Sequence, residues 1–443
     1  MGSRLNPRFS GQLNYSQRLP IMWVDFPRIL QRLARVSVYV TVILTSACAD
    51  RGLEAVIQRP SCRFFGVYNG RRAGEAYGIG VAVSPTPRGP WTRCNECGRL
   101  LSAPSPYLHL AKPTLAIVGD TIFLYVQAVR YSPEPKADLL LFTSLDGVAW
   151  HQDTATRLTD VWRPVVYFDA LSQDDRFRLW FRNTTDDVEM ASSRDGRSWR
   201  KHGVVLSKGN TGAFDDLAVA PGAVIPVDSG YSLLYEAVDR NLRFSGGLAF
   251  SRSWNVPLEK VGTAPVLEPD RVEAFLTKRA VIGDTALRTT DARRFRPGMT
   301  VYVIDKRGRW STARIRDASA NGVVLAESLP LSFEVDDGTV VRSFAFSKVY
   351  PSSILRDRDE WVVFATAFDP ELGIASAGIE SMAMLRGRDL RELRWDIENA
   401  PPLPLRSSSD TSWDSASREN LSTIDLKGRS LAVSLAGACI VTQ

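Results

Sequence analysis

Short apolar stretches separated by polar turns recur along this chain. In each of four copies an apolar stretch with a Pro near its start is followed by a polar turn and a second stretch rich in aromatic and branched residues. The copies are residues 112–128, 163–182, 220–237 and 350–367. Alternating apolar and polar positions bounded by Gly, Asp and Pro predict β-strands. Helical periodicity is almost absent after residue 50, so we predict an all-β fold.

A second phrase often follows the first and ends in Trp. It reads FTSLDGVAW at 142–150, ASSRDGRSW at 191–199 and VAVSPTPRGPW at 81–91. A unit of roughly 50 residues with several strands predicts a β-propeller, in which the sheets are arranged as blades around an axis, or another repeat array. Because Trp91, Trp150 and Trp199 occupy matching points, we expect them to pack in the core between blades.

Setting the copies in register divides the chain into five blades. The first three span 104–158, 160–207 and 213–268, and the fourth begins near Phe275, is interrupted, resumes at Phe346 and runs to about Pro404. The fifth is split, with two inner strands from Glu419–Ala438 and outer strands from Arg63–Trp91. Pairing both chain ends in one blade would close the ring and leave no open sheet edge.

The interruption, residues 279–344, contains five or six short strands with tight turns. It resembles small SH3-like β-barrel modules, and about 65 residues can fold as a unit. The predicted organisation is therefore a leader (1–50), a first propeller part (51–278), an inserted small β-barrel (279–344) and a second propeller part (345–443).

The leader has the pattern of an export signal. Arg28, Arg32 and Arg35 precede an apolar run at 36–47 that ends in LTSAC. Twelve apolar residues are too few to span a membrane but suit a signal peptide, with Met22 a more usual start. Small residues before Cys48 resemble a bacterial lipobox, in which Cys48 would carry lipid. The alternatives are a plain signal peptide or a signal anchor; each places the protein outside the cytoplasm.

Four other cysteines remain: Cys62, Cys94, Cys97 and Cys439. An even number in an exported protein indicates disulfides, and a bond between Cys62 and Cys439 would lock the two chain ends together. The Cys94–Cys97 pair suits a loop clip, a redox pair or half a metal site. A zinc site needs four ligands, and the chain has no second CxxC and only three His, so we expect no metal and no cofactor.

The net charge of +6 is small for 443 residues. No run of Lys and Arg interleaved with aromatics appears, so the sequence does not indicate a nucleic-acid partner. A mildly basic surface favours anionic polymers or an anionic membrane surface.

The phrases FDDLAVAPGAVIPVDSGYSLLYEA, LAFSRSW and ASSRDGRSW carry a resemblance. Over most of 60–278 and 346–440 the chain resembles the five-bladed β-propeller glycoside hydrolases, which include arabinanase/xylosidase-like, levanase/invertase-like and mannoside-phosphorylase-like groups. The resemblance implies a monomer that acts on an oligo- or polysaccharide at the bacterial surface. The SxDGxxW phrase is also near the sialidase Asp-box, which leaves a six-bladed sialidase as an alternative.

In these enzymes the site is a funnel on the ring axis, lined by the first strand of each blade. Cleavage of a glycosidic bond needs one acid and one base or nucleophile. The resemblance thus implies catalytic roles for Asp160, Asp215, Glu236 and Glu419, and substrate binding by His109, Lys112, Arg163, Asp216 and Lys348. Tyr350, Arg418 and Asn420 also open first strands.

Each candidate also has a structural interpretation. Asp215 could hold a turn, and its neighbour Asp216 would point the opposite way on a strand. Glu236 could pair with Arg240 or Arg243. Lys and Arg stand before Pro where the arabinanase-like group has Asp, so a non-catalytic surface protein that binds glycan or acts as a scaffold is the alternative function.

Overall fold

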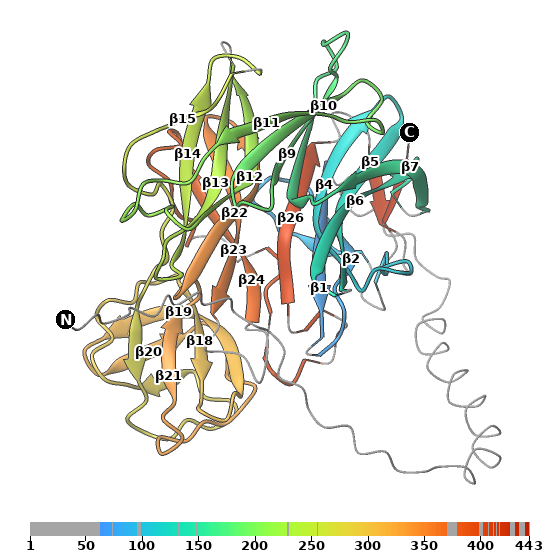
Figure 1. The fold of residues 1–443 in the computed structure, drawn as a ribbon. Helices are drawn as coiled ribbons and strands as arrows, with labels where there is room; N and C mark the ends of the chain where they lie inside the picture. Colours follow the sequence, from blue (N-terminus) through green and yellow to red (C-terminus); the bar gives the residue numbers. More distant parts are fainter. Residues whose placement is uncertain are drawn as a thin grey trace, which may run out of the picture. The chain divides into compact units, whose positions relative to one another are not determined.

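A computed structural model describes residues 63–442, except for gaps at 73, 95–98, 132, 148, 228–229, 255, 370–378, 398–401, 406, 411, 413, 416, 426–429 and 434–438. Every regular element in these residues is a β-strand, which confirms the all-β prediction (Figure 1). The described part of the chain contains no helix with the length and hydropathy to cross a membrane. The leader and Cys48 lie outside the described residues.

Twenty of the strands in the described residues form five antiparallel groups of four, numbered sheets I to V here. Sheets III, IV and V are joined by two single parallel pairs, Phe244↔Lys348 and Glu380↔Ser417, into one continuous twelve-stranded sheet. Sheet I holds β4 (His109–Val118), β5 (Thr121–Tyr131), β6 (Pro135–Ser144) and β7 (His151–Thr159), and sheet II holds β8 (Trp162–Phe168), β9 (Phe177–Arg182), β10 (Val188–Ser193) and β11 (Arg200–Leu206). Sheet III holds β12 (Ala218–Val227), β13 (Gly230–Val238), β14 (Phe244–Ser251) and β15 (Glu259–Lys260). Sheet IV holds β22 (Lys348–Asp357), β23 (Glu360–Asp369), β24 (Ile379–Gly387) and β25 (Arg394–Trp395).

Sheet V joins the two ends of the described chain: β26 (Ser417–Asp425) pairs with β1 (Phe64–Arg71), followed by β2 (Gly78–Ser84) and β3 (Thr92–Arg93). The prediction of two C-terminal strands in this sheet was wrong. The second edge of β1 is occupied by β2, so one strand completes the sheet, and β27 (Ser430–Val433) pairs with β28 (Cys439–Thr442) instead.

Cys94 is disulfide-bonded. Cys62 and Cys97 lie outside the described residues, so the bond between Cys62 and Cys439 stays a prediction.

The first strands of the five sheets contact one another in the order β4, β8, β12, β22, β26, and β26 also contacts β4. At one point in each sheet the pairing of the first strand with the second shifts register. Beyond these bulges, residues of all five first strands line a cavity of about 580 Å³. The described residues thus hold five such sheets, which does not agree with the six-bladed sialidase alternative.

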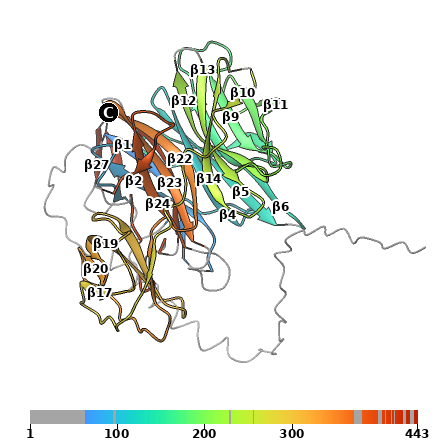
Figure 2. The same ribbon diagram turned by 90° about the vertical axis from the view of Figure 1, so that its left-hand side faces the viewer.

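The strands between sheets III and IV form a separate six-stranded sheet, visible as a group in Figure 2. Its strands are β16 (Glu273–Phe275), β17 (Ala286–Arg288), β18 (Thr300–Ile304), β19 (Trp310–Ser319), β20 (Gly322–Leu325) and β21 (Val340–Ser343). They enclose their own core of buried side chains, among them Val301, Phe333 and Val341. The assignment of Phe275 to the fourth blade was wrong, because β16 pairs with β21.

The SxDGxxW phrases form turns between the third and fourth strands of sheets I and II. Ser144 Oγ accepts a hydrogen bond from the Gly147 N–H at 2.8 Å, and Ser193 Oγ accepts one from Gly196 at 2.9 Å. Both glycines have φ above 70°, in the left-handed region that favours glycine. Trp150 packs against a buried cluster shared by sheets V and I, and Trp199 packs against one shared by sheets I and II, as predicted.

Candidate active site

The bulges in three first strands hold non-glycine residues in a left-handed conformation. Lys112, Arg163 and Asn420 have φ of 50°, 52° and 55°. Such conformations cost about 1–3 kcal/mol each and are commonest at functional sites. The three residues stand in the equivalent register shifts of β4, β8 and β26, so the same backbone strain recurs in three sheets.

Polar side chains of adjacent sheets hold these bulges. The N–H of Lys112 donates to Asn69 Oδ1 at 3.1 Å, and the N–H of Arg163 donates to Gln127 Oε1 at 2.7 Å. The N–H of Asn420 donates to Thr366 Oγ1 at 3.0 Å. Each acceptor lies on the second strand of the preceding sheet, so contacts between sheets fix the strained backbone.

Each second strand carries a polar residue at the same place, next to the bulge of the first strand with which it pairs. These residues are Asn69, Gln127, Arg182, Glu236 and Thr366, which pair with Glu419, Ala111, Trp162, Ala220 and Tyr350. Asn69, Gln127 and Arg182 were not among the predicted site residues. Their signal in the sequence is a lone polar residue inside an apolar strand, as in FFGVYNGR or IFLYVQAV.

Five side chains from sheets I to V converge at these bulges, and we name them the charged cluster: Lys112, Arg163, Glu236, Tyr350 and Glu419. Glu419 Oε2 accepts hydrogen bonds from Asn420 Nδ2 at 2.7 Å and from Lys112 Nζ and Tyr350 Oη at 3.1 Å each. Lys112 Nζ also donates to Tyr350 Oη at 3.1 Å. The Glu419 residue is only 2% exposed, so the cations beside it compensate its burial.

The second carboxylate, Glu236 on β13, forms an ion pair with Arg163 and is also 2% exposed. The Arg163 guanidinium carbon lies 4.5 Å from the centre of the Tyr350 ring, which connects the two ion pairs. Burial lowers the pKa of Arg163, but Glu236, Tyr350 and Glu419 outweigh it and raise that pKa above its usual value. The cluster thus contains two carboxylates, two cations and a phenol.

Asp215 lies outside the charged cluster, in a contact that sheet V repeats. Tyr235 Oη donates to Asp215 Oδ2 at 3.0 Å, and Lys260 Nζ of the outer strand lies 2.6 Å from that oxygen. In sheet V, Tyr68 Oη donates to Asp414 Oδ2 at 2.8 Å and Arg93 pairs with Asp414 at 2.6 Å. The recurrence of this Tyr–Asp–cation contact indicates that it ties the loop before a first strand to its own sheet.

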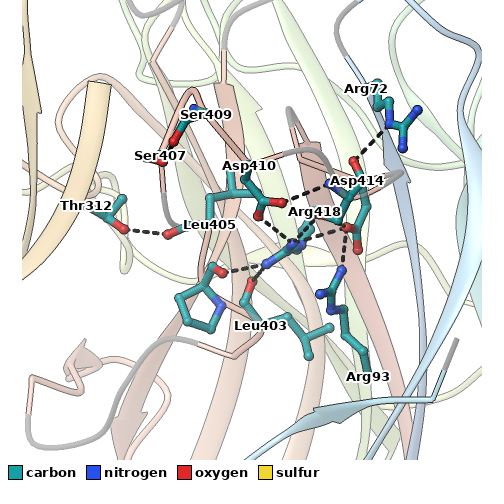
Figure 3. A network of polar contacts seen from close by, with 12 residues as sticks. Arg72, Arg93, Thr312, Leu403, Leu405, Ser407, Ser409, Asp410, Asp414 and Arg418 are labelled. Carbon is teal, nitrogen blue, oxygen red and sulfur yellow. Dashed lines mark hydrogen bonds and ion pairs between the residues drawn. The ribbon is translucent and has the colours of Figure 1, made fainter. Parts of the chain in front are cut away.

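A polar network holds the start of β26 (Figure 3). Arg418, 3% exposed, donates to Asp414 Oδ1 and Ser412 Oγ at 3.1 Å each and to the carbonyl of Pro404. Thr312 of the inserted sheet donates to the neighbouring carbonyl of Leu405. Arg418 directly precedes Glu419, so this network positions the cluster's most heavily hydrogen-bonded carboxylate.

Two further predicted site residues, Asp216 and Asp160, lie in loops before first strands. Asp216 accepts hydrogen bonds from the N–H groups of Gly212 at 2.7 Å and Arg240 at 3.0 Å. The Gly212 N–H is the main reason that the pKa of Asp216 lies below its usual value. Asp160 is half-buried, with φ of 60°, between β7 and β8. The structural interpretation of Glu236 named Arg240 or Arg243 as its partner. In the structure Glu236 pairs with Arg163, and Arg240 pairs with Asp216.

His109 and Lys348 open β4 and β22. His109 Nδ1 accepts a hydrogen bond from the Tyr77 N–H at 3.2 Å, and burial together with Arg71 lowers its pKa. Lys348 Nζ lies 4.2 Å from the centre of the Phe244 ring. In the described part of the chain, no three His, Cys, Asp or Glu residues lie close enough together to hold a metal ion.

No family model matches this sequence, and no curated protein matches it. The structure matches five-bladed propeller glycoside hydrolases and phosphorylases at low identity. A β-1,2-mannobiose phosphorylase from Listeria innocua, in complex with β-1,2-mannobiose, is 17% identical, with 59% of this chain and 68% of that chain covered and a TM-score of 0.39. An α-L-arabinanase from Cellvibrio cellulosa, complexed with arabinohexaose, is 12% identical, with 78% and 92% covered and a TM-score of 0.41. An exo-1,5-α-L-arabinanase from a bovine ruminal metagenomic library is also 12% identical, with 80% and 100% covered and a TM-score of 0.39.

Proposed function

We propose that this protein acts on a carbohydrate as a glycoside hydrolase, with the charged cluster as its active centre. In this proposal sheets I to V are the blades of a closed five-bladed β-propeller, and the cluster lies on its axis. The observation that carries the proposal is that two carboxylates, Glu236 and Glu419, from different sheets are paired with Arg163 and Lys112, which stand on strained bulges. Most glycoside hydrolases use a pair of carboxyl groups to cleave the glycosidic bond.

The hydrogen bonds assign a role to Glu419. One oxygen of this side chain accepts three hydrogen bonds, from Lys112, Tyr350 and Asn420. An oxygen with three donors is that of a carboxylate rather than of a protonated acid, which suits a base or nucleophile. Glu236 is the second carboxylate, and Arg163 and Lys112 orient the substrate. Asp215 is left out of this set, because Tyr235 and Lys260 hold it in the loop contact described above.

The experiment is a screen of the full-length protein on 4-nitrophenyl glycosides and plant and fungal polysaccharides. We expect turnover by the wild type and a loss of about 10²–10⁴-fold in Glu419→Gln and Glu236→Gln, the range for removal of an acid or base. Glu334→Gln, on the inserted segment and half-exposed, is the matched control and should keep full turnover. Unchanged turnover in Glu419→Gln would remove the charged cluster from the mechanism.

A second candidate is a non-catalytic protein that binds glycan. It is favoured by one observation: both carboxylates are 2% exposed and already paired with a cation. A protein of this kind would bind polysaccharide in a glycan array and release no sugar from any member of the screen.

We also propose that the protein is exported and anchored by lipid at Cys48. The leader with its apolar run and LTSAC sequence supports this proposal. A Cys48→Ser variant should lose incorporation of radiolabelled palmitate and move from the membrane fraction to the soluble exported fraction. Equal labelling of wild type and variant would refute the anchor.

A further inference from the structure

Beside the charged cluster lies a second pocket of about 510 Å³, which we name the rim pocket. Its lining comes from the loop before β12, the turn between β13 and β14, and the residues that lead into the inserted sheet. Such a volume falls within the usual range of small-molecule sites, about 300–1,000 Å³.

Phe244 connects the rim pocket with the charged cluster. Its ring lines the pocket, and its centre lies 6.4 Å from the centre of the Tyr350 ring. The Lys348 ammonium lies 4.2 Å from the same Phe244 ring. Phe244 therefore belongs to the pocket lining and lies next to a residue of the charged cluster.

The lining of the rim pocket combines two aromatic rings with guanidinium groups. Phe214 and Phe244 supply the rings, and Arg243, Arg271 and Arg294 supply the cations. Among the described residues, the exposed guanidinium groups of Arg243 and Arg271 have no ion-pair partner.

Two of the three carboxylates in the lining are already engaged. Asp239 accepts hydrogen bonds from the N–H groups of Asn241 at 2.8 Å and Arg243 at 2.9 Å, which fix the turn. Asp270 pairs with Arg296 at 3.5 Å. The exposed Glu268 is the third, so in the lining two guanidinium groups without an ion pair among the described residues, Arg243 and Arg271, outnumber one such carboxylate.

We propose that the rim pocket is a subsite for an acidic sugar, one that carries a carboxylate or a sulfate ester. The guanidinium groups of Arg243 and Arg271 would bind the anionic group with paired hydrogen bonds. The rings of Phe214 and Phe244 would pack against the C–H face of the sugar. The inference rests on the proposed function, because it takes the charged cluster as the place where the same glycan is held.

The test is affinity electrophoresis of the full-length protein at 0.15 M salt, where loose polyelectrolyte attraction is screened. The gels contain polygalacturonate or its methyl ester, and dextran sulfate or dextran. In at least one pair, the acidic polymer should retard the wild type about tenfold more strongly than its neutral counterpart. A response to polygalacturonate indicates a carboxylate ligand, and a response to dextran sulfate indicates a sulfate ester. Equal retardation by both members of each pair, or none at all, would overturn the proposal.

The residues are tested with Arg243→Gln/Arg271→Gln, which should weaken binding about tenfold or more. Arg279→Gln/Arg316→Gln removes the same charge from exposed positions of the inserted segment and should stay within about twofold of the wild type. Equal loss in both variants, or no loss in the first, would contradict the proposal. If the first variant does not fold, Arg243→Lys/Arg271→Lys replaces it, because Lys keeps the charge and loses the paired hydrogen bonds.

Glu419→Gln separates this inference from the proposed function. It should keep the acidic-polymer binding and lose turnover. Turnover of neutral glycosides without acidic-polymer binding would overturn the subsite alone, and acidic-polymer binding without any turnover would overturn hydrolysis alone.

Discussion

At the scale of single residues, buried carboxylates serve two different purposes, depending on the groups around them. Asp215 and Asp414 each receive a tyrosine hydroxyl and a cation, whereas Glu236 and Glu419 meet cations that stand on strained bulges. In both sheets the tyrosine lies over a glycine of the third strand: a Cβ at Gly247 would come within 2.5 Å of the Tyr235 ring, and one at Gly80 would meet Tyr68 likewise. The loop contact is thus a packed structural unit.

Asp215→Asn should therefore lower the free energy of unfolding and leave the turnover of the folded protein largely unchanged. The substitution leaves Lys260 without its carboxylate and Tyr235 with a weaker acceptor, so we expect the free energy of unfolding to fall by about 2 kcal/mol. Urea unfolding measures this, with the exposed Asp174→Asn as control. Loss of turnover in a fully folded Asp215→Asn would instead place Asp215 in the mechanism.

His109 gives a pH dependence whose sign follows from its hydrogen bond. Its Nδ1 accepts from Tyr77, which requires the unprotonated nitrogen, and its pKa in the folded protein lies below the ordinary value. The unfolded chain then binds more protons near pH 6.5, so this contribution to stability is present above that pH and is lost as the pH falls through it.

His109→Asn tests this, because the amide oxygen can keep the hydrogen bond and does not titrate. Urea unfolding at pH 5.5 and 7.5 should show a smaller difference between the two pH values in the variant than in the wild type. An unchanged difference would show that His109 does not contribute.

The residues of the charged cluster differ in how far the sequence predicted them. Lys112 and Arg163 could be found because each stands before the Pro that opens a repeated phrase. The ion pair of Arg163 with Glu236 could not, because it joins strands of two sheets whose relative register depends on packing rather than on the local pattern. For the same reason Asn69 and Gln127, whose partners lie in the next sheet, were not predicted.

At the scale of elements, the inserted sheet is a separate unit whose first and last residues lie close together in space. The Asp270 N–H donates to the Ala345 carbonyl at 2.8 Å, so the ends of the insertion are adjacent. The boundary predicted at residue 279 left Phe275 outside this unit, because a short apolar stretch looks the same in either sheet. Only its pairing with Val340 distinguishes the two.

Replacement of residues 271–344 by a two-residue Asn-Gly turn should leave sheets I to V folded. The excision removes the contacts of Thr312 with Leu405 and of Trp310 with Ser408, so we expect a single unfolding transition at a lower midpoint. Circular dichroism during thermal unfolding measures both. An unfolded product would show that the inserted sheet is needed for the fold of the rest.

At the scale of the whole molecule, sheet V depends on strands from opposite ends of the described chain. Seven residue pairs join β1 to β26, from Phe64↔Asp425 to Arg71↔Ser417, and Arg63 pairs with Asp425 across this junction. The sequence predicted that the ends meet in one blade, because pairing them leaves no open sheet edge.

A chain that ends after residue 416 should fail to fold cooperatively, because it exposes an edge of β1 and loses Glu419, Asn420 and the Arg418 network. A chain that ends after Asp425 keeps every strand of the five sheets and should unfold in one transition. Proteolysis at increasing urea concentration compares the two. Equal resistance would show that β26 is dispensable.

The pairing of Asn420 with Asn69, 351 residues apart in sequence, also sets the order of events during synthesis. Contacts this distant form late, since the loop between them must close before they are gained. At about 5–20 residues per second, β26 leaves the ribosome tens of seconds after β1. Glu419 therefore reaches the other cluster residues only after β26 has been synthesised. A nascent polypeptide that does not yet contain β26 cannot assemble this centre.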